Sequence, residues 1–198
     1  KEGEVIRGEF GESIVHGNMK TIVADKQPIY SDDGKIVGLL GYFREVAQYR
    51  KIKERMKFLE RYDELTDSVN SHGLLEGAHN FVESYDFRHI DFALTIFKLE
   101  NLKEFVNAYG YSMGEEMIKS VFEILKKTFG MNSLLGHPEF DILTILHQTS
   151  PYGNFQEEVA TVQKQIEKIN RIAGIRYNIY TSVSTTYYSE VEDFEKMK

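Results

Sequence analysis

Three glutamates and one lysine in the second half of the sequence have side chains that could support chemistry at a site. Lys98 lies at the end of a predicted strand and Glu100 at its junction with the next helix. Glu115 lies early in a predicted helix, and Glu139 lies in a predicted tight turn. Each has a plain structural explanation, because such residues are usually solvated and Glu115 completes a capping box with Ser112. The six histidines show no paired spacing for metal binding. Glu139 is therefore the best candidate for a functional side chain.

Composition excludes several classes of protein. The 198 residues include 24 Lys and Arg against 31 Asp and Glu, a net charge of −7, which argues against a general affinity for nucleic acid or an anionic membrane. Cysteine is absent, so disulfides, thiol catalysis and cysteine-based metal sites are excluded. The longest clearly apolar run, residues 36–43, is far shorter than the ~18 residues of a membrane span, and nothing resembles a signal peptide. We expect a cytoplasmic protein with no membrane segment in this chain and no nucleic-acid partner.

The first region, residues 1–47, has the pattern of a small antiparallel sheet. Strands are predicted over residues 5–10, 21–30 and 36–46, and an Asp-Gly turn at residues 31–34 joins the last two as a hairpin. Three strands alone bury little apolar area. Either they pack on the C-terminal part of the chain, or upstream sequence is missing.

Residues 48–62 are strongly charged and predict a helical linker. Its apolar stripe is Tyr49, Ile52, Met56 and Leu59, spaced three, four and three residues apart. This spacing fits the seam of a homodimer, but it spans only two heptads. An amphipathic connector that lies on its own domain explains the stripe equally well.

Helices and strands alternate over residues 63–198 and predict an α+β domain, with helices covering a mixed sheet. Capping boxes are expected at Asn101 with Glu104, at Ser112 with Glu115, and at Asn154 with Glu157. The predicted elements are a helix at 73–85, a strand at 92–99, helices opening at 101 and 112, a tight turn at 136–139, a strand at 140–146, a helix at 154–173 capped by Gly174, and a strand at 177–185.

Three motifs in this region, in order and with the right elements between them, resemble the GGDEF domain. The family pattern D-x-L-T-G-L-x-N-R compares with D-E-L-T-D-S-V-N-S at residues 63–71. The pattern D-x-D-x-F-K-x-x-N-D-x-x-G-H-x-x-G-D compares with residues 98–115, and G-G-[DE]-E-F compares with G-H-P-E-F at residues 136–140. Active members of the family join two GTP molecules into cyclic di-GMP. The resemblance implies a nucleotidyl-cyclase-like fold, which we expect to lack the family's last helix.

Residues 21–30 and 34–46 resemble the closing strands of a PAS domain, a sensor module that often precedes GGDEF domains through a helix. The front of a PAS fold, which builds much of the ligand cavity, has no counterpart in the sequence. The resemblance implies a sensor upstream of the GGDEF-like domain.

The resemblance also implies that the metal site is degenerate. In the family, Mg²⁺ is held by the first aspartate of D-x-D and by the acidic third residue of G-G-[DE]-E-F, positions that Lys98 and Pro138 take here. An ammonium repels Mg²⁺, and proline offers no side-chain oxygen. Gly136 is kept, but His137 replaces the glycine that lets the backbone approach phosphate.

Recognition of guanine and of the product is altered as well. Val106 takes the place of the asparagine that reads the base, and Glu115 takes the place of its aspartate partner. Val106 also falls on the apolar stripe of its helix, which suggests a core residue. The family's inhibitory R-x-x-D motif compares with Lys127 and Gly130, which supply neither a guanidinium fork nor an acid.

These substitutions favour a catalytically inactive signalling domain downstream of a PAS sensor, which acts by oligomerisation or by binding a protein partner. It would need no cofactor. The alternatives are an active diguanylate cyclase that uses Mg²⁺ and GTP, and a regulatory module that binds GTP without turnover. For Lys98 we expect either that its ammonium replaces the metal, by pairing with Glu139 or Glu100, or that it extends into solvent.

Overall fold

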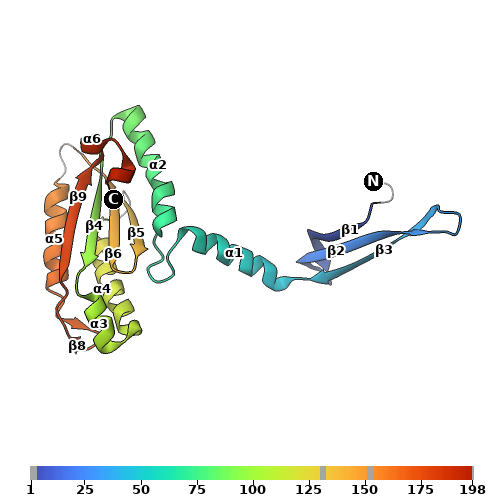
Figure 1. Ribbon diagram of the computed structural model, residues 1–198, viewed down its shortest axis with the longest axis horizontal. Helices are drawn as coiled ribbons and strands as arrows, with labels where there is room; N and C mark the ends of the chain where they lie inside the picture. Colours follow the sequence, from blue (N-terminus) through green and yellow to red (C-terminus); the bar gives the residue numbers. More distant parts are fainter. Residues whose placement is uncertain (1–3, 130–132, 151–153, 198) are drawn as a thin grey trace. The chain divides into compact units, whose positions relative to one another are not determined.

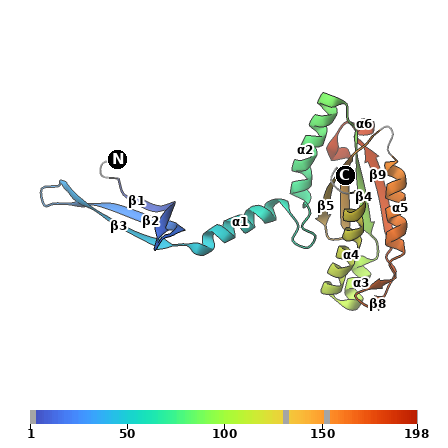
Figure 2. The same ribbon diagram turned by 180° about the vertical axis from the view of Figure 1, so that it is seen from behind.

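The computed structural model describes residues 4–129, 133–150 and 154–197, without the side chains of residues 47–50. The chain divides into two units, residues 1–58 and 59–198, and each is described by itself. Figures 1 and 2 show the elements of both units from opposite sides.

The first unit contains a three-stranded antiparallel sheet in the order β1-β2-β3. Its strands are β1 (Ile6–Val15), β2 (Asn18–Tyr30) and β3 (Ile36–Glu45). The predicted hairpin at residues 31–34 is confirmed, with Gly34 at φ 80° and its N–H bonded to the carbonyl of Ser31 at 2.9 Å. The first strand is five residues longer at its end than predicted, because His16 and Gly17 adopt the positive φ angles of a two-residue hairpin turn.

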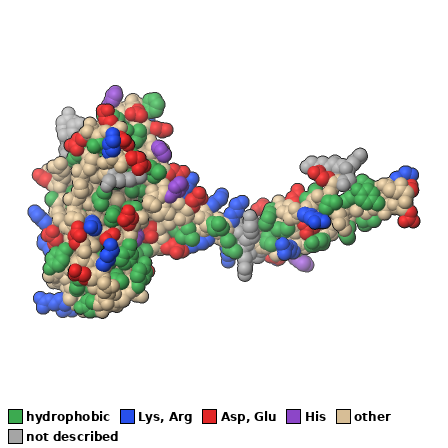
Figure 3. Space-filling model, in the orientation of Figure 1, with side chains coloured by type: hydrophobic (Ala, Val, Ile, Leu, Met, Phe, Trp, Pro, Cys, Tyr) green, Lys and Arg blue, Asp and Glu red, His purple; other side chains and the backbone are tan. Residues whose placement is uncertain are grey.

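This sheet leaves most of its apolar side chains in solvent. Among the described residues of the first unit, Val23 is the one buried hydrophobic residue. Figure 3 shows hydrophobic side chains on the surface of the unit. The large exposed ones are Val5, Phe10, Ile14, Met19, Ile29, Tyr30, Ile36, Val37, Leu39, Leu40, Tyr42, Phe43, Ile52 and Met56.

The linker helix α1 (Ala47–Arg61) forms as predicted. Along its apolar stripe, Ile52, Met56 and Leu59 are 54%, 67% and 42% exposed. The side chain of Tyr49 lies outside the described part of the chain. The stripe is therefore available for contact over its described length.

The second unit is an α+β domain around a four-stranded sheet in the order β5-β6-β4-β9, and its described strand pairs are antiparallel. This confirms the predicted fold class. The elements are α2 (Ser71–Arg88), β4 (Phe92–Leu99), α3 (Leu102–Tyr109), α4 (Tyr111–Phe129), β5 (Ser133–Glu139), β6 (Ile142–Gln148), α5 (Phe155–Glu167), β7 (Arg171–Ile172), β8 (Ile175–Arg176), β9 (Thr181–Tyr187), α6 (Tyr188–Val191) and a 3-10 turn, Phe194–Lys196.

Helices cover both faces of this sheet, with α2 and α5 on opposite sides in Figures 1 and 2. On one face, Ala93 and Phe97 of β4 pack in a core with α3, α4 and α5. On the other face, Phe92 and Leu94 pack with α2 and α6. Residues of one strand alternate between faces, so the apolar run of β4 serves two cores.

Several predicted boundaries were wrong. The last long helix ends at Glu167 rather than near residue 173, because Ala173 and Gly174, at φ 43° and 88°, form the turn of the β7–β8 hairpin. The final strand begins at Thr181, and two short helical turns follow it. Residues 136–139 lie in β5, and the turn falls instead at residues 140–141.

The capping boxes are also wrong in detail. Asn101 and Asn154 precede their helices, but neither side chain caps the helix. Asn101 instead donates its amide to the carbonyl of Asn178 at 2.8 Å and accepts the Tyr180 N–H at 3.1 Å. Ser112 lies inside α4, which begins at Tyr111, so it cannot be the N-cap.

Candidate functional site

Asp63 organises the loop that joins α1 to α2. Its Oδ1 atom accepts hydrogen bonds from the Thr66 N–H at 2.9 Å, the Thr66 hydroxyl at 2.8 Å and His137 Nδ1 at 2.9 Å. Burial raises the pKa of the Asp63 carboxyl, but the hydrogen bonds from His137 and Thr66 outweigh it, so the pKa lies below its usual value. Asp63 is therefore held as a carboxylate.

Asn70, the last residue of the same loop, is hydrogen-bonded to both helices. The amide of Asn70 donates to the carbonyls of Leu59 and Tyr62 at 3.0 and 3.3 Å, and its oxygen caps α2 by accepting the Gly73 N–H at 3.0 Å. One side chain thus binds the end of one helix and the start of the next.

The loop is also bonded to the signature strand β5. Val69 donates its N–H to the Leu135 carbonyl at 3.2 Å and accepts the His137 N–H at 2.8 Å, a parallel bridge beside Gly136. A side chain on Gly136 would lie 2.6 Å from the Thr144 hydroxyl, which explains why glycine stands here. The first and third family motifs thus form one structural unit.

The His137 side chain is buried. The side chain is only 7% exposed, and its two ring nitrogens face Asp63 Oδ1 and, at 3.3 Å, the carbonyl oxygen of Phe140. Sequence reasoning treated this histidine as ordinary and missed the contact. One signal in the sequence could have indicated the contact. His137, whose ring can form hydrogen bonds, replaces a family glycine, and the chain retains Asp63 of the first motif.

Pro138 and Glu139 end β5. The pairing of β5 with β6 shifts between Gly136 and Glu139, and a proline is tolerated in such an irregular segment because it has no N–H to donate. Glu139 is exposed, and no ion pair to it occurs in the described part of the chain. Tyr111, at the start of α4, stacks on Phe140 in the turn with ring centroids 5.5 Å apart.

Lys98 forms an ion pair at the end of β4. Its Nζ lies 3.6 Å from Glu100 Oε2, and the Ser182 hydroxyl donates to Glu100 Oε1 at 2.6 Å. The Ser182 hydrogen bond, with a further contribution from the Lys98 charge, lowers the pKa of Glu100. The prediction that the ammonium contacts a carboxylate is confirmed for Glu100; in the described residues no such pair links it to Glu139. Both side chains are about half exposed, so the pair adds little stability.

The residues present do not fit the family's Mg²⁺ ion. The ammonium of Lys98 stands at one ligand position, Pro138 stands at the other, and His137 is bonded to Asp63. The described residues contain no group of three His, Asp or Glu side chains that could hold a metal. Hard cations need several oxygen ligands, so we assign no metal to this site.

Val106 and Glu115 lie on neighbouring helices, α3 and α4. Val106 is half-buried and packs against the main core, and its Cγ2 atom occupies the space beside Gly114. The predicted core position is confirmed. Glu115 is half-buried within α4, but not in a capping box.

The two candidate inhibitory residues can be followed only in part. Lys127 is exposed in the last turn of α4, and Gly130 lies outside the described residues.

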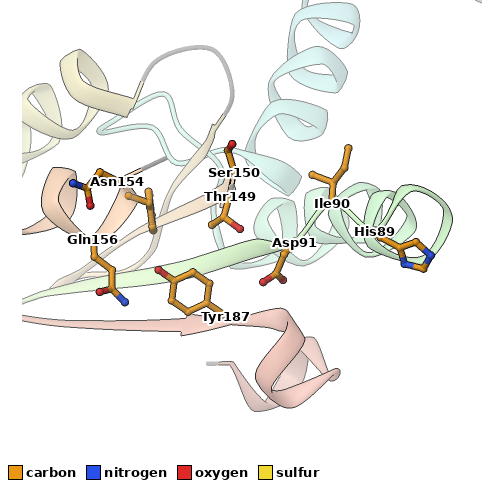
Figure 4. Close-up of a pocket in the computed structure, with 9 residues that line it drawn as sticks. His89, Ile90, Asp91, Thr149, Ser150, Asn154, Gln156 and Tyr187 are labelled. Atoms are coloured by element: carbon orange, nitrogen blue, oxygen red, sulfur yellow. The ribbon is translucent and has the colours of Figure 1, made fainter. Parts of the chain in front are cut away.

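A pocket of about 650 Å³ lies at the opposite end of the sheet from the signature turn, where α2 ends and α5 begins. Asp91, Thr149 and Tyr187 line it (Figure 4). Both oxygens of Asp91 are used, since they accept hydrogen bonds from Phe92 and Ser189. Sequence reasoning did not identify this pocket, because its residues come from four separate segments.

The fold, with the first and third motifs bonded to each other, defines a nucleotidyl-cyclase-like α+β domain. A family model described as the diguanylate cyclase GGDEF domain matches residues 60–197, and the chain belongs to this family. No curated protein matches the sequence. No described helix is both long enough and apolar enough to cross a membrane.

Solved structures share the fold at low sequence identity. A diguanylate cyclase/phosphodiesterase from Caldicellulosiruptor saccharolyticus has 21% identity and a TM-score of 0.59, over 66% of this chain and 77% of that one. The diguanylate cyclase SiaD from Pseudomonas aeruginosa, solved with its activator SiaC, has 15% identity and a TM-score of 0.63, over 75% of this chain and 58% of SiaD. The coiled coil and GGDEF domain of DgcB from Caulobacter crescentus, solved with c-di-GMP, has 12% identity and a TM-score of 0.59, over 72% of this chain and 75% of that one.

Proposed function

We propose that this GGDEF domain does not make cyclic di-GMP and serves as a signalling domain, through self-association or a protein partner. The Lys98–Glu100 ion pair carries the proposal. It shows a cation at the position where active members have a metal-binding carboxylate. Phosphoryl-type chemistry depends on metal ions and positioned charges, so the exchange removes the main catalytic element.

Two further features support inactivity. The Val106 side chain packs against Gly114, and valine supplies no hydrogen bond to a guanine edge. His137 is bonded to Asp63, and its Cβ stands where the family has only a glycine hydrogen. Base recognition, phosphate approach and metal binding are thus all altered.

The test is titration with GTP, with and without Mg²⁺ or Mn²⁺, followed by product analysis. We expect no cyclic di-GMP. A Glu139→Ala variant is the control, since Glu139 is the acidic residue of the signature stretch that remains exposed. Product that accumulates in proportion to the protein, and is absent with Glu139→Ala, would show an active cyclase. Binding without product would indicate a GTP-dependent regulatory module.

We also propose that signals enter through the first unit. Its three-stranded sheet is interpreted as the end of a PAS-like sensor, and the exposed stripe of Ile52, Met56 and Leu59 as a homodimer seam. Two relatives illustrate the modes proposed here: SiaD is in complex with its activator SiaC, and DgcB has a coiled coil. The absence of cysteine agrees with a cytoplasmic setting.

A further inference from the structure

Two arginines lie directly opposite each other on the β7–β8 hairpin. Arg171 and Arg176 are paired in register, and so are Ile172 and Ile175 beside the turn. The Tyr177 N–H donates to the Asn170 carbonyl at 3.1 Å, so the arginines form the non-hydrogen-bonded pair, whose side chains come closest across two strands.

Both guanidinium groups project to solvent. Successive residues of a strand face opposite sides, and Ile172 is fully buried in the main core. Arg171 and Arg176 are exposed, and no ion pair neutralises either one in the described part of the chain. Like charges directly opposite each other destabilise a hairpin, and this chain has a net charge of −7. Fold stability therefore does not explain the pair, whereas an anionic ligand would.

A pocket of about 480 Å³ adjoins Arg176 and has walls suited to a nucleotide. Arg176 lines it together with Asn170 and Asn178, which offer amide donors. Tyr180, 60% exposed, offers a ring on which a base can stack. Glu104, on the opposite element α3, offers a carboxylate that can accept an N–H of a base.

The α3 wall of this pocket faces away from Val106, although Asn101 and Tyr180 of its lining adjoin Glu100. Glu104 and Val106 are two residues apart on α3, about 200° around the helix axis, so they face different sides. The pocket lies on the β8 side of α3, and both elements stand at the same end of the second unit in Figures 1 and 2.

We propose that this pocket binds a nucleoside phosphate, with the phosphate between Arg171 and Arg176 and the base between Tyr180 and Glu104. Paired guanidinium groups match phosphate oxygens in geometry and charge. The volume suits a small ligand rather than a protein segment. The proposal does not depend on whether the GGDEF site is active.

Calorimetry and amide chemical shifts with GMP, ribose 5-phosphate and inorganic phosphate test this site in the full chain. We expect GMP to bind most tightly and to shift amides of residues 170–180. Arg171→Gln and Arg176→Gln should each weaken GMP binding roughly tenfold or more, and Tyr180→Ala should weaken GMP but not inorganic phosphate. Arg88→Gln, which changes a single exposed arginine on α2, is the matched control and should bind GMP like the parent chain.

Arg171→Glu separates ligand binding from stability. It replaces a like-charge pair with an opposite-charge pair across the hairpin, so the variant should be at least as stable as the parent yet lose GMP binding. Equal GMP affinity in the parent and in both glutamine variants would overturn the proposal. The proposal would also be overturned if the chain bound an acidic peptide but bound none of GMP, ribose 5-phosphate and inorganic phosphate.

Discussion

Replacing Asp63 by alanine tests whether this residue holds the loop and the signature strand together. The substitution removes the acceptor of three hydrogen bonds, two from Thr66 and one from His137. His137 is buried and loses a hydrogen bond to a charged partner, which contributes about 1.5–3 kcal/mol to stability. Each Thr66 hydrogen bond contributes about 0.5–1.5 kcal/mol, and water can replace part of this contribution. We expect the free energy of unfolding to fall by about 2–4 kcal/mol.

Urea denaturation followed by circular dichroism measures this loss. Glu123→Ala is the matched control, because it removes the same charge from an exposed position on α4 and should change stability by less than about 0.5 kcal/mol. A double-mutant cycle with His137→Ala should give a coupling energy of about 1 kcal/mol or more. An Asp63→Ala loss no larger than the control's, or additive single effects, would refute the role given to this contact.

The pH dependence has a defined sign. Burial raises the pKa of Asp63, the bonds from His137 and Thr66 lower it, and the net effect is a lower pKa than in the unfolded chain. The contribution of Asp63 is therefore fully present above the unfolded pKa of about 3.9, and is lost as the pH falls through the lower native pKa. The stability difference between the parent and Asp63→Ala should shrink only in that acidic range. A difference that already shrinks between pH 7 and 5 would assign the effect to another group.

Three other experiments test separate features. Gly136→Ala places a methyl group 2.6 Å from the Thr144 hydroxyl and should cost about 1–3 kcal/mol in urea denaturation; an unchanged midpoint would mean that β5 shifts freely. Calorimetry should detect weak or no cyclic di-GMP binding to the parent chain, and micromolar affinity that vanishes in Lys127→Ala would contradict the proposal that the inhibitory site is lost. Ile52→Glu combined with Leu59→Glu should make any dimer monomeric, and an unchanged mass in light scattering would place the interface elsewhere.

The sequence predicted best where one local pattern governs an element. The predicted bounds of β4, residues 92–99, coincide with the observed ones, because a run of apolar residues serves two cores. Prediction from the sequence failed where one local pattern is compatible with two different structures. Ala173 and Gly174 fit both a helix end and a hairpin turn, and the structure has the hairpin.

The candidate site was predictable as a set of substitutions, but not as a set of contacts. The contact of Lys98 with Glu100 and the core position of Val106 were predicted, since each follows from the residue's position on one strand or helix. The Asp63–His137 hydrogen bond joins residues 74 positions apart, and no periodicity encodes such a contact. The same holds for Asn101, whose amide binds residues 178–180 rather than its own helix.

The order of strands has a consequence for synthesis on the ribosome. β4 lies between β6 and β9, and its pairing with β9 joins Thr95 to Thr185, 90 residues further along the chain. A nascent chain that ends before Thr181 therefore holds β4 as an open edge, with main-chain groups free to pair with another chain. Contacts of such long sequence separation form late and slow folding. Translation of β9 therefore completes the pairing of β4, and in the finished sheet the short strand β9 takes over as the edge.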